Sequence, residues 1–159
     1  MNTDTYPLTI DTFEAYRTIS DHALFKALSK KQELCTINLR HCYQISAETF
    51  MCLPFARTAK QIDVSYTTIT NDGLHNIFTR CPYLERLYVI GCKSISTAGF
   101  LTWSLPLTLR YVCFHETSIT TEQMNHVFYA VQSSKERSCV NWWFFNYPLF
   151  PTYAGLPLG

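Results

Sequence analysis

Hydrophobic positions recur along the middle of this chain with a period of 25 residues. Three columns of apolar residues register at this shift, and each column has four members. The columns are Leu34, Ala59, Leu84 and Leu109; Ile37, Ile62, Leu87 and Val112; and Leu39, Val64, Val89 and Phe114. A constant period of this length predicts an array of similar structural units that bury their apolar faces together.

Each unit is expected to contain a short strand, a turn and a helix. Apolar and polar residues alternate through the last two columns, which is the period of a strand. An isoleucine follows in every unit, with Ser or Thr directly after it at the position of a helix N-cap. Thr120 and Gln123 form a capping-box pattern. Apolar pairs at helical spacing complete the units: Phe50/Leu53, Leu74/Ile77, Phe100/Trp103 and Met124/Val127.

Two kinds of turn alternate between strand and helix. The first and third units carry Cys42 and Cys92, which we expect to pack as small hydrophobic groups in a tight slot. The second and fourth units, "SYTTIT" and "HETSIT", are one residue shorter and carry threonines instead. Stacked units of this kind predict an α/β fold with a parallel sheet on one face and helices on the other.

The segment "LERLYVIGCKSISTAGF" resembles a unit of the leucine-rich repeat family, in its cysteine-containing subtype. It matches the pattern L-x-x-L-x-L-x-x-C-x-x-I-(S/T)-x-x-(G/A)-(L/F) at every marked position, with the aliphatic Val89 at the third leucine. "LCTINLRHCYQISAETF" departs from this pattern at Thr49, and "QIDVSYTTITNDGL" is the shorter threonine form. The resemblance implies a solenoid of about four to five strand–turn–helix units, with the parallel sheet on its concave face.

The period also predicts the domain organisation. Residues 1–131 form the solenoid, in which residues 1–33 are a degenerate N-terminal unit or cap. Residues 132–159 are a C-terminal cap and an extended tail rich in aromatic residues and proline. This tail either covers the last unit or, from about Tyr147, lies along another protein. Its candidate protein-binding residues are Trp142, Trp143, Phe145, Tyr147, Phe150 and Tyr153.

Composition narrows the classes of function. The net charge of +1 suggests no contact with nucleic acid, and no run of residues predicts a transmembrane segment. Seven cysteines without a CxxC pair argue against a disulfide framework and against a zinc ribbon. The start "MNTDTYPLTIDTF" has neither a signal core nor the basic character of a transit peptide. We therefore expect an intracellular, reducing compartment.

The cysteines and histidines are the residues that could support chemistry. A nucleophile–base pair could come from His41 with Cys42 or from Cys113 with His115, and zinc ligands from these together with His75 or His126. However, Cys42 falls on a core position of the repeat, and the sequence offers no orienting group or oxyanion site. No ligand pair has metal spacing, and no phosphate-binding loop is present. The sequence predicts no enzyme, no metal and no cofactor.

The solvent side of the predicted strands is the more informative surface. Alternation places there Thr36, Asn38 and Arg40; Gln61, Asp63 and Ser65; Arg86, Tyr88 and Ile90; and Tyr111, Cys113 and His115. Tyr and Arg are enriched at interface hot spots, whereas an ordinary solvated face is the alternative. The predicted protein-binding residues of the concave face are Arg86, Tyr88, Ile90, Tyr111, His115, Arg40 and Asp63.

These observations predict a non-catalytic interaction or scaffold subunit with protein partners in a larger assembly. The chain resembles short repeat proteins related to mitochondrial ATP synthase subunit s (coupling factor B) in size, repeat number and a degenerate first unit, "LTIDTFEAYRTIS". This resemblance implies an accessory or assembly component of a respiratory or ATP synthase complex, in the mitochondrion or otherwise in the cytoplasm. The alternative comes from the similar repeats of F-box proteins, and is substrate recognition with a separate ubiquitin-ligase adaptor.

Overall fold

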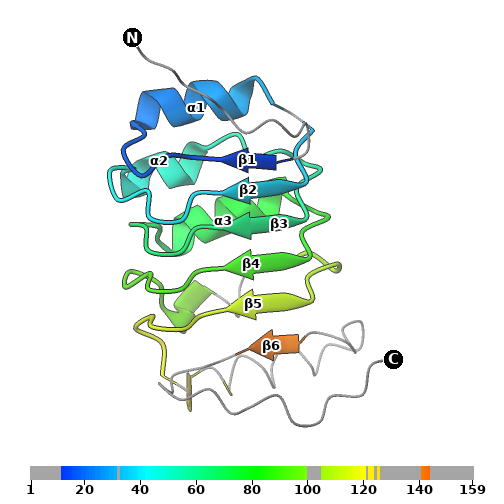
Figure 1. Cartoon of the computed structure of the whole chain (residues 1–159). Helices are drawn as coiled ribbons and strands as arrows, with labels where there is room; N and C mark the ends of the chain where they lie inside the picture. Colours follow the sequence, from blue (N-terminus) through cyan, green and yellow to red (C-terminus); the bar gives the residue numbers. More distant parts are fainter. Residues whose placement is uncertain are drawn as a thin grey trace, which may run out of the picture.

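The computed structural model describes residues 12–31, 33–99, 105–120, 122–123 and 125, and the backbone of residues 141–143. Six strands form one parallel sheet, in which their order is the order of the chain (Figure 1). The strands are β1 (Thr12–Glu14), β2 (Thr36–Asn38), β3 (Gln61–Asp63), β4 (Arg86–Tyr88), β5 (Tyr111–Cys113) and β6 (Asn141–Trp143). The predicted α/β class with a parallel sheet is confirmed.

Helical segments alternate with these strands and lie together behind the sheet (Figure 1). They are α1 (Asp21–Ser29), α2 (Ala47–Cys52), α3 (Asn71–Arg80) and a single 3-10 turn, η1 (Thr97–Gly99). The predicted apolar pairs Phe100/Trp103 and Met124/Val127 lie partly or wholly outside the described residues.

The 25-residue period of the sequence is the pairing register of the sheet. Thr36 pairs with Gln61, Gln61 with Arg86, and Arg86 with Tyr111. The ladder continues past the strand ends, since the backbone N–H of Leu39 donates to the carbonyl of Asp63 at 2.7 Å. The same bond recurs one and two units later. Equivalent side chains of the three predicted columns therefore lie in line, as the period predicts.

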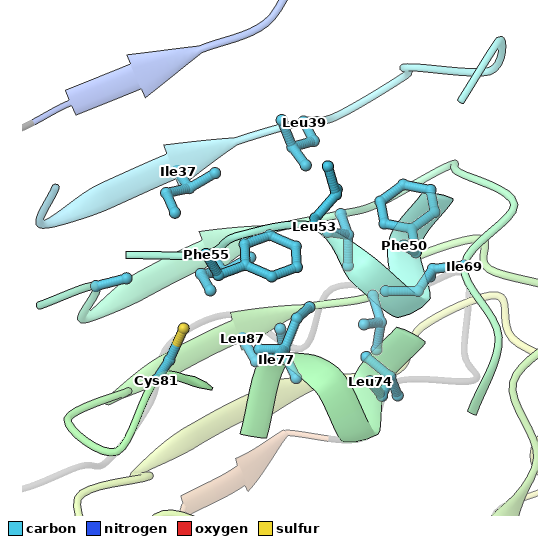
Figure 2. Close-up of a cluster of buried hydrophobic side chains, with 14 of the residues drawn as sticks. Ile37, Leu39, Phe50, Leu53, Phe55, Ile69, Leu74, Ile77, Cys81 and Leu87 are labelled. Atoms are coloured by element: carbon cyan, nitrogen blue, oxygen red, sulfur yellow. The ribbon is translucent and has the colours of Figure 1, made fainter. Parts of the chain in front are cut away.

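The core fills the space between the sheet and the helices (Figure 2). Inward-facing strand residues such as Ile37 and Leu87 meet Phe50 of α2 and Leu74 and Ile77 of α3, and all five side chains are fully buried. Burial of each large apolar side chain contributes roughly 1.5–3 kcal/mol. The strand and helix of a single unit cannot cover each other's apolar faces, so this stabilisation depends on the neighbouring units.

Helix N-termini are held partly by the preceding unit. Ser46 caps α2 as predicted, because its hydroxyl accepts from the N–H of Thr49 at 3.2 Å. Thr70 occupies the N-cap position of α3 as predicted, but its side chain makes no capping hydrogen bond. The side chain of Asn71, the first residue of α3, holds the start of the next helical segment. Its side chain donates to the Ser96 hydroxyl at 2.8 Å and accepts from the Ser96 N–H at 3.1 Å.

The capping box predicted at Thr120 and Gln123 is present. The N–H of Thr120 donates to Gln123 Oε1 at 2.9 Å, and the N–H of Gln123 donates to Thr120 Oγ1 at 3.2 Å. Two backbone donors at a helix start are satisfied reciprocally in this way.

The two kinds of turn differ in what closes them. In the longer turn, the N–H of Ile95 donates to the carbonyl of Cys92 at 3.4 Å. In the shorter turn, the Thr67 hydroxyl replaces that carbonyl: it accepts from the N–H of Ile69 at 3.4 Å and donates to the carbonyl of Val64 at 2.7 Å. Thr117 makes the same two bonds in its unit. In the shorter turns a threonine hydroxyl thus takes the place of the backbone carbonyl that accepts this bond in the longer turns.

The cysteines of the longer turns are buried but also donate hydrogen bonds. Cys92 Sγ lies 3.2 Å from the carbonyl oxygen of Val64, and Cys42 Sγ lies 3.6 Å from that of Tyr16, both in the preceding unit. The thiols therefore do more than fill the slot, which corrects the prediction that they act only as small hydrophobic groups. They add a second hydrogen bond to carbonyls that already accept one, from the Thr67 hydroxyl and the Ile19 N–H.

We expect Thr67→Val to lower the free energy of unfolding by about 1–3 kcal/mol, because the substitution keeps the shape but removes both hydrogen bonds. Thr67→Ser keeps the hydroxyl and should retain most of the stability. Thr79→Val is the matched control, since the exposed Thr79 hydroxyl bonds only to His75 one helical turn back. Urea unfolding of the three variants measures the differences. Equal losses for Thr67→Val and Thr79→Val would contradict the proposed closing role.

Candidate protein-binding surface

The side of the sheet away from the helices, here called the sheet face, carries most of the residues predicted to lie there. Arg86 is exposed, and Asp63, Tyr88 and Tyr111 are half-buried on it. Three further predicted residues sit in the turns directly after the strands and are also half-buried: Arg40, Ile90 and His115.

Two residues predicted to face solvent are buried. The Ser65 hydroxyl accepts from the N–H of Ile90 at 3.2 Å, and the Ser65 N–H donates to Asp63 Oδ1 at 2.8 Å, so Ser65 lies within the turn. Cys113 is 7% exposed. It is a small residue on a strand with a paired neighbour on each side, beside the larger Tyr88. Alternation alone does not capture either effect.

The structure brings the predicted residues together in separate groups. On β4 and β5, the rings of Tyr88 and Tyr111 have their centroids 5.1 Å apart at an angle of 48°. Arg86 lies beside them, since its Cα partner on β5 is Tyr111. We name these three residues the tyrosine patch. Apart from them, Nη1 of Arg40, in the turn after β2, lies 3.7 Å from Oδ2 of Asp63 on β3.

His115 belongs to the turn after β5. Its Nε2 lies 3.4 Å from Glu116 Oε1, whereas its Nδ1 is buried and has no hydrogen-bond partner among the described residues. The contact that His115 makes is therefore with its own turn neighbour, Glu116.

A row of turn residues was missed by the sequence analysis. One residue in the turn after each of β2, β3, β4 and β5 has a positive φ, between 56° and 69°, and these residues are 25 positions apart. They are His41, Tyr66, Gly91 and Glu116. We name them the exit-turn row. The left-handed conformation is uncommon for residues with a side chain. The period aligns the four positions, but Gly91 is the one whose residue type signals a positive φ.

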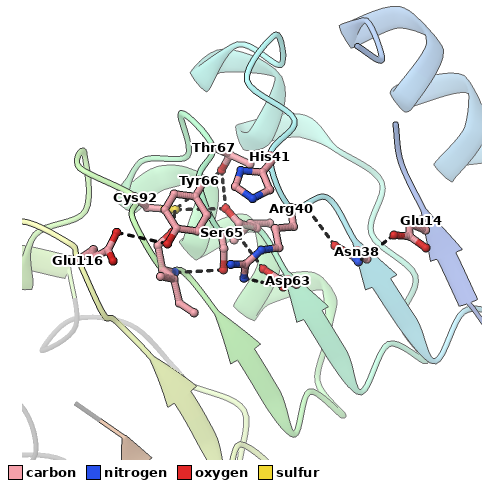
Figure 3. A network of polar contacts seen from close by, with 12 residues as sticks. Glu14, Asn38, Arg40, His41, Asp63, Ser65, Tyr66, Thr67, Cys92 and Glu116 are labelled. Carbon is pink, nitrogen blue, oxygen red and sulfur yellow. Dashed lines mark hydrogen bonds and ion pairs between the residues drawn. The ribbon is translucent and has the colours of Figure 1, made fainter. Parts of the chain in front are cut away.

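Tyr66 is the centre of this row (Figure 3). The His41 ring stacks on its ring at 4.7 Å and 12°, and Arg40 Cζ lies 4.9 Å from the ring centroid. Tyr66 also packs against Gly91, where an added Cβ would lie 2.4 Å from Tyr66 Cδ1. Its hydroxyl donates to Glu116 Oε2 at 3.3 Å. One side chain thus bridges from the second strand–turn unit of the period to the fourth.

The pKa shifts of His41 and Tyr66 follow from their packing in this cluster. Partial desolvation and the nearby Arg17 and Arg40 guanidiniums lower the pKa of His41, so its ring is neutral at pH 7. Desolvation and the Glu116 carboxylate raise the pKa of Tyr66. Its phenol stays protonated and able to donate the hydrogen bond.

The candidate nucleophile pair His41–Cys42 is not assembled. His41 Nδ1 lies 2.5 Å from the hydroxyl of Tyr43, whereas the Cys42 thiol points to the carbonyl of Tyr16. Burial raises the pKa of Cys42 to about 11, so the thiolate is scarce at neutral pH. Among the described residues, no group of three His, Cys, Asp or Glu side chains could hold a metal ion.

The described part of the tail forms a strand. The backbone of Trp142 and Trp143 pairs in parallel with Val112 and Cys113, so the sheet extends into the segment predicted as cap and tail. The other predicted tail residues lie outside the described residues: Phe145, Tyr147, Phe150 and Tyr153. None of the helices in the described ranges has both the length and the apolar character to cross a bilayer.

No protein-family model matches this chain, and a search of curated proteins returns no match.

We expect Gly91→Ala to destabilise the protein by at least about 1–2 kcal/mol, since a Cβ at φ +69° is strained and meets the Tyr66 ring at 2.4 and 2.5 Å. In a Tyr66→Ala background the ring contact is gone and only the backbone strain remains. The cost of Gly91→Ala should therefore be smaller there. Urea unfolding of the four proteins gives a coupling energy of about 0.5–3 kcal/mol. Equal costs in both backgrounds would refute this packing.

Proposed function

We propose that this chain is a leucine-rich repeat solenoid that acts as a non-catalytic interaction or scaffold subunit of a larger protein assembly. The observation that carries the proposal is the tyrosine patch on the sheet face, where two tyrosines and an arginine lie side by side. Rigid aromatic side chains beside an arginine are typical of the centre of protein interfaces.

The repeat geometry supports the leucine-rich repeat assignment. The sheet keeps one register over four strands, and the Cys and Thr positions of the pattern close the turns as a repeated device. Gly73 stands at the G/A position of the pattern, and close packing favours glycine there. A Cβ on Gly73 would lie 2.6 Å from Ile69 Cγ1 and 2.9 Å from Phe50 Cβ.

A scaffold role agrees with the chemistry of the described residues. The six cysteines among them are free thiols, which suits an intracellular, reducing compartment. Burial raises the pKa values of Cys42 and Cys81 to about 11 and about 12, respectively, which disfavours thiolate chemistry. For the assembly itself we propose a mitochondrial respiratory or ATP synthase complex, on the resemblance described above. A ubiquitin-ligase adaptor complex is the alternative that the experiment distinguishes.

The test is co-purification of the tagged full chain from cells, with partners identified by mass spectrometry. We expect the Tyr88→Ala/Tyr111→Ala double variant to weaken partner recovery roughly 30-fold or more, as loss of a hot spot of about 2 kcal/mol predicts. The control is Tyr43→Ala/Tyr83→Ala, which removes two tyrosines that are each 56% exposed and lie in turns outside the strands. Urea unfolding verifies that both variants fold.

The identity of the recovered proteins decides between the assemblies. Respiratory or ATP synthase subunits support the first, and cullin-associated adaptors support the alternative. Cell fractionation checks the compartment, and a chain ending at residue 146 tests the predicted docking of the tail. A folded protein that recovers no partner, or whose recovery is insensitive to the tyrosine patch, would overturn the proposal.

A further inference from the structure

Positive side chains on and beside the sheet face differ in whether a carboxylate accompanies them. Arg40 has Asp63 at 3.7 Å, and Lys60 has Glu85 at 3.7 Å. Arg86 is exposed, and its guanidinium bonds to the neutral amide of Gln61, with Nη1 and Oε1 3.5 Å apart. No carboxylate in the described part of the chain forms an ion pair with it. Within these described ranges the charge of Arg86 is therefore uncompensated.

The acidic residues nearest along the sheet do not cancel this charge. Asp63 lies on the neighbouring strand, but it already faces Arg40 and accepts from the Ser65 N–H. Glu14 lies on β1, three strands away from β4, which corresponds to about 14 Å at the usual strand spacing. The Debye length at physiological salt is about 8 Å, so Glu14 is screened.

The surroundings of Arg86 suit an ion pair that excludes water. Tyr111 is its Cα partner on β5, and Tyr88 stands two residues along the same strand and faces the same side. Both tyrosines are half-buried, and the buried thiol of Cys113 is the Cα partner of Tyr88. A carboxylate placed on Arg86 would thus be flanked by aromatic rings. Such neighbours lower the local dielectric and strengthen the pair.

We propose that the tyrosine patch binds an acidic side chain of a protein partner, carried next to an apolar one. The guanidinium pairs with the carboxylate in the bidentate geometry that arginine favours, and the apolar neighbour covers the Tyr88 and Tyr111 rings. A single uncompensated cation fits one carboxylate better than a polyphosphate chain, whose binding needs several cations. This inference rests on the proposed function and specifies the chemistry of the partner.

The experiment uses the purified full chain and random peptides displayed on phage. We expect selected peptides to carry Asp or Glu beside an aromatic or branched apolar residue. Binding of a selected synthetic peptide should weaken roughly 10- to 100-fold with Arg86→Gln, as loss of a charged hydrogen bond predicts. Arg110→Gln is the matched control, because it removes the same charge from an exposed residue just before Tyr111. It should change the affinity less than about twofold.

A charge exchange sharpens the test. Arg86→Glu should abolish binding of the acidic peptide, and a peptide with Lys at the acidic position should then bind this variant better than the wild type. If Arg86→Gln and Arg110→Gln weaken binding equally, the effect is one of net charge and the inference fails. If peptides depend on Tyr88 and Tyr111 but not on Arg86, the inference fails while the proposed function stands. If peptide binding depends on none of the three residues, both fail.

Discussion

The structure depends on one constraint, which is that each strand must bury its inward side chain at the same height as its neighbours. Parallel strands share a backbone ladder, so a shift of one residue would turn the apolar columns toward solvent. The pairing of Ile37 with Ile62, of Ile62 with Leu87 and of Leu87 with Val112 meets this constraint at a step of 25 residues. From β2 to β5 the connections between strands all have the same total length, although their parts differ, whereas the outer pairs Thr12–Thr36 and Tyr111–Asn141 use other lengths.

This constraint explains why the turns vary while the period does not. The threonine turns are one residue shorter than the cysteine turns, and the lost residue is recovered before the next strand. Thr67 makes the shorter turn feasible because its hydroxyl does the work of a backbone carbonyl. Cys92 instead donates to the carbonyl of Val64, one unit back. The threonine thus makes its contacts within its own turn, whereas the cysteine thiol contacts the preceding unit.

The features that could be predicted from the sequence are those that follow from spacing. The buried columns, the parallel sheet and the capping box at Thr120 all follow from the distances between residue types. Spacing could not predict that Ser65 turns inward, because the bond from the Ile90 N–H is made between units. It also could not predict the left-handed backbone at Tyr66, since tyrosine carries no preference for positive φ.

The candidate site could also be predicted only where it follows from spacing. Alternation placed Tyr88 and Tyr111 on one face of adjacent strands, and their contact follows from the register. The pairing state of the arginines did not follow, because it depends on whether a carboxylate stands on the neighbouring strand at the right height. Arg40 has such a neighbour in Asp63, whereas Arg86 has Gln61.

The reach of Tyr66 to Glu116 has a mechanical consequence for the molecule. In most stacked-repeat proteins each unit contacts only its nearest neighbours, so each interface between units can bend or open separately. Here the phenol ring spans the turn at Gly91 and ties two units that are not adjacent. Widening the spacing along this edge would break that tie, while the opposite edge has no equivalent span among the described residues. The sheet should therefore resist bending more at the edge that carries the exit turns than at the opposite edge. The contacts of the exit turns should then set its curvature.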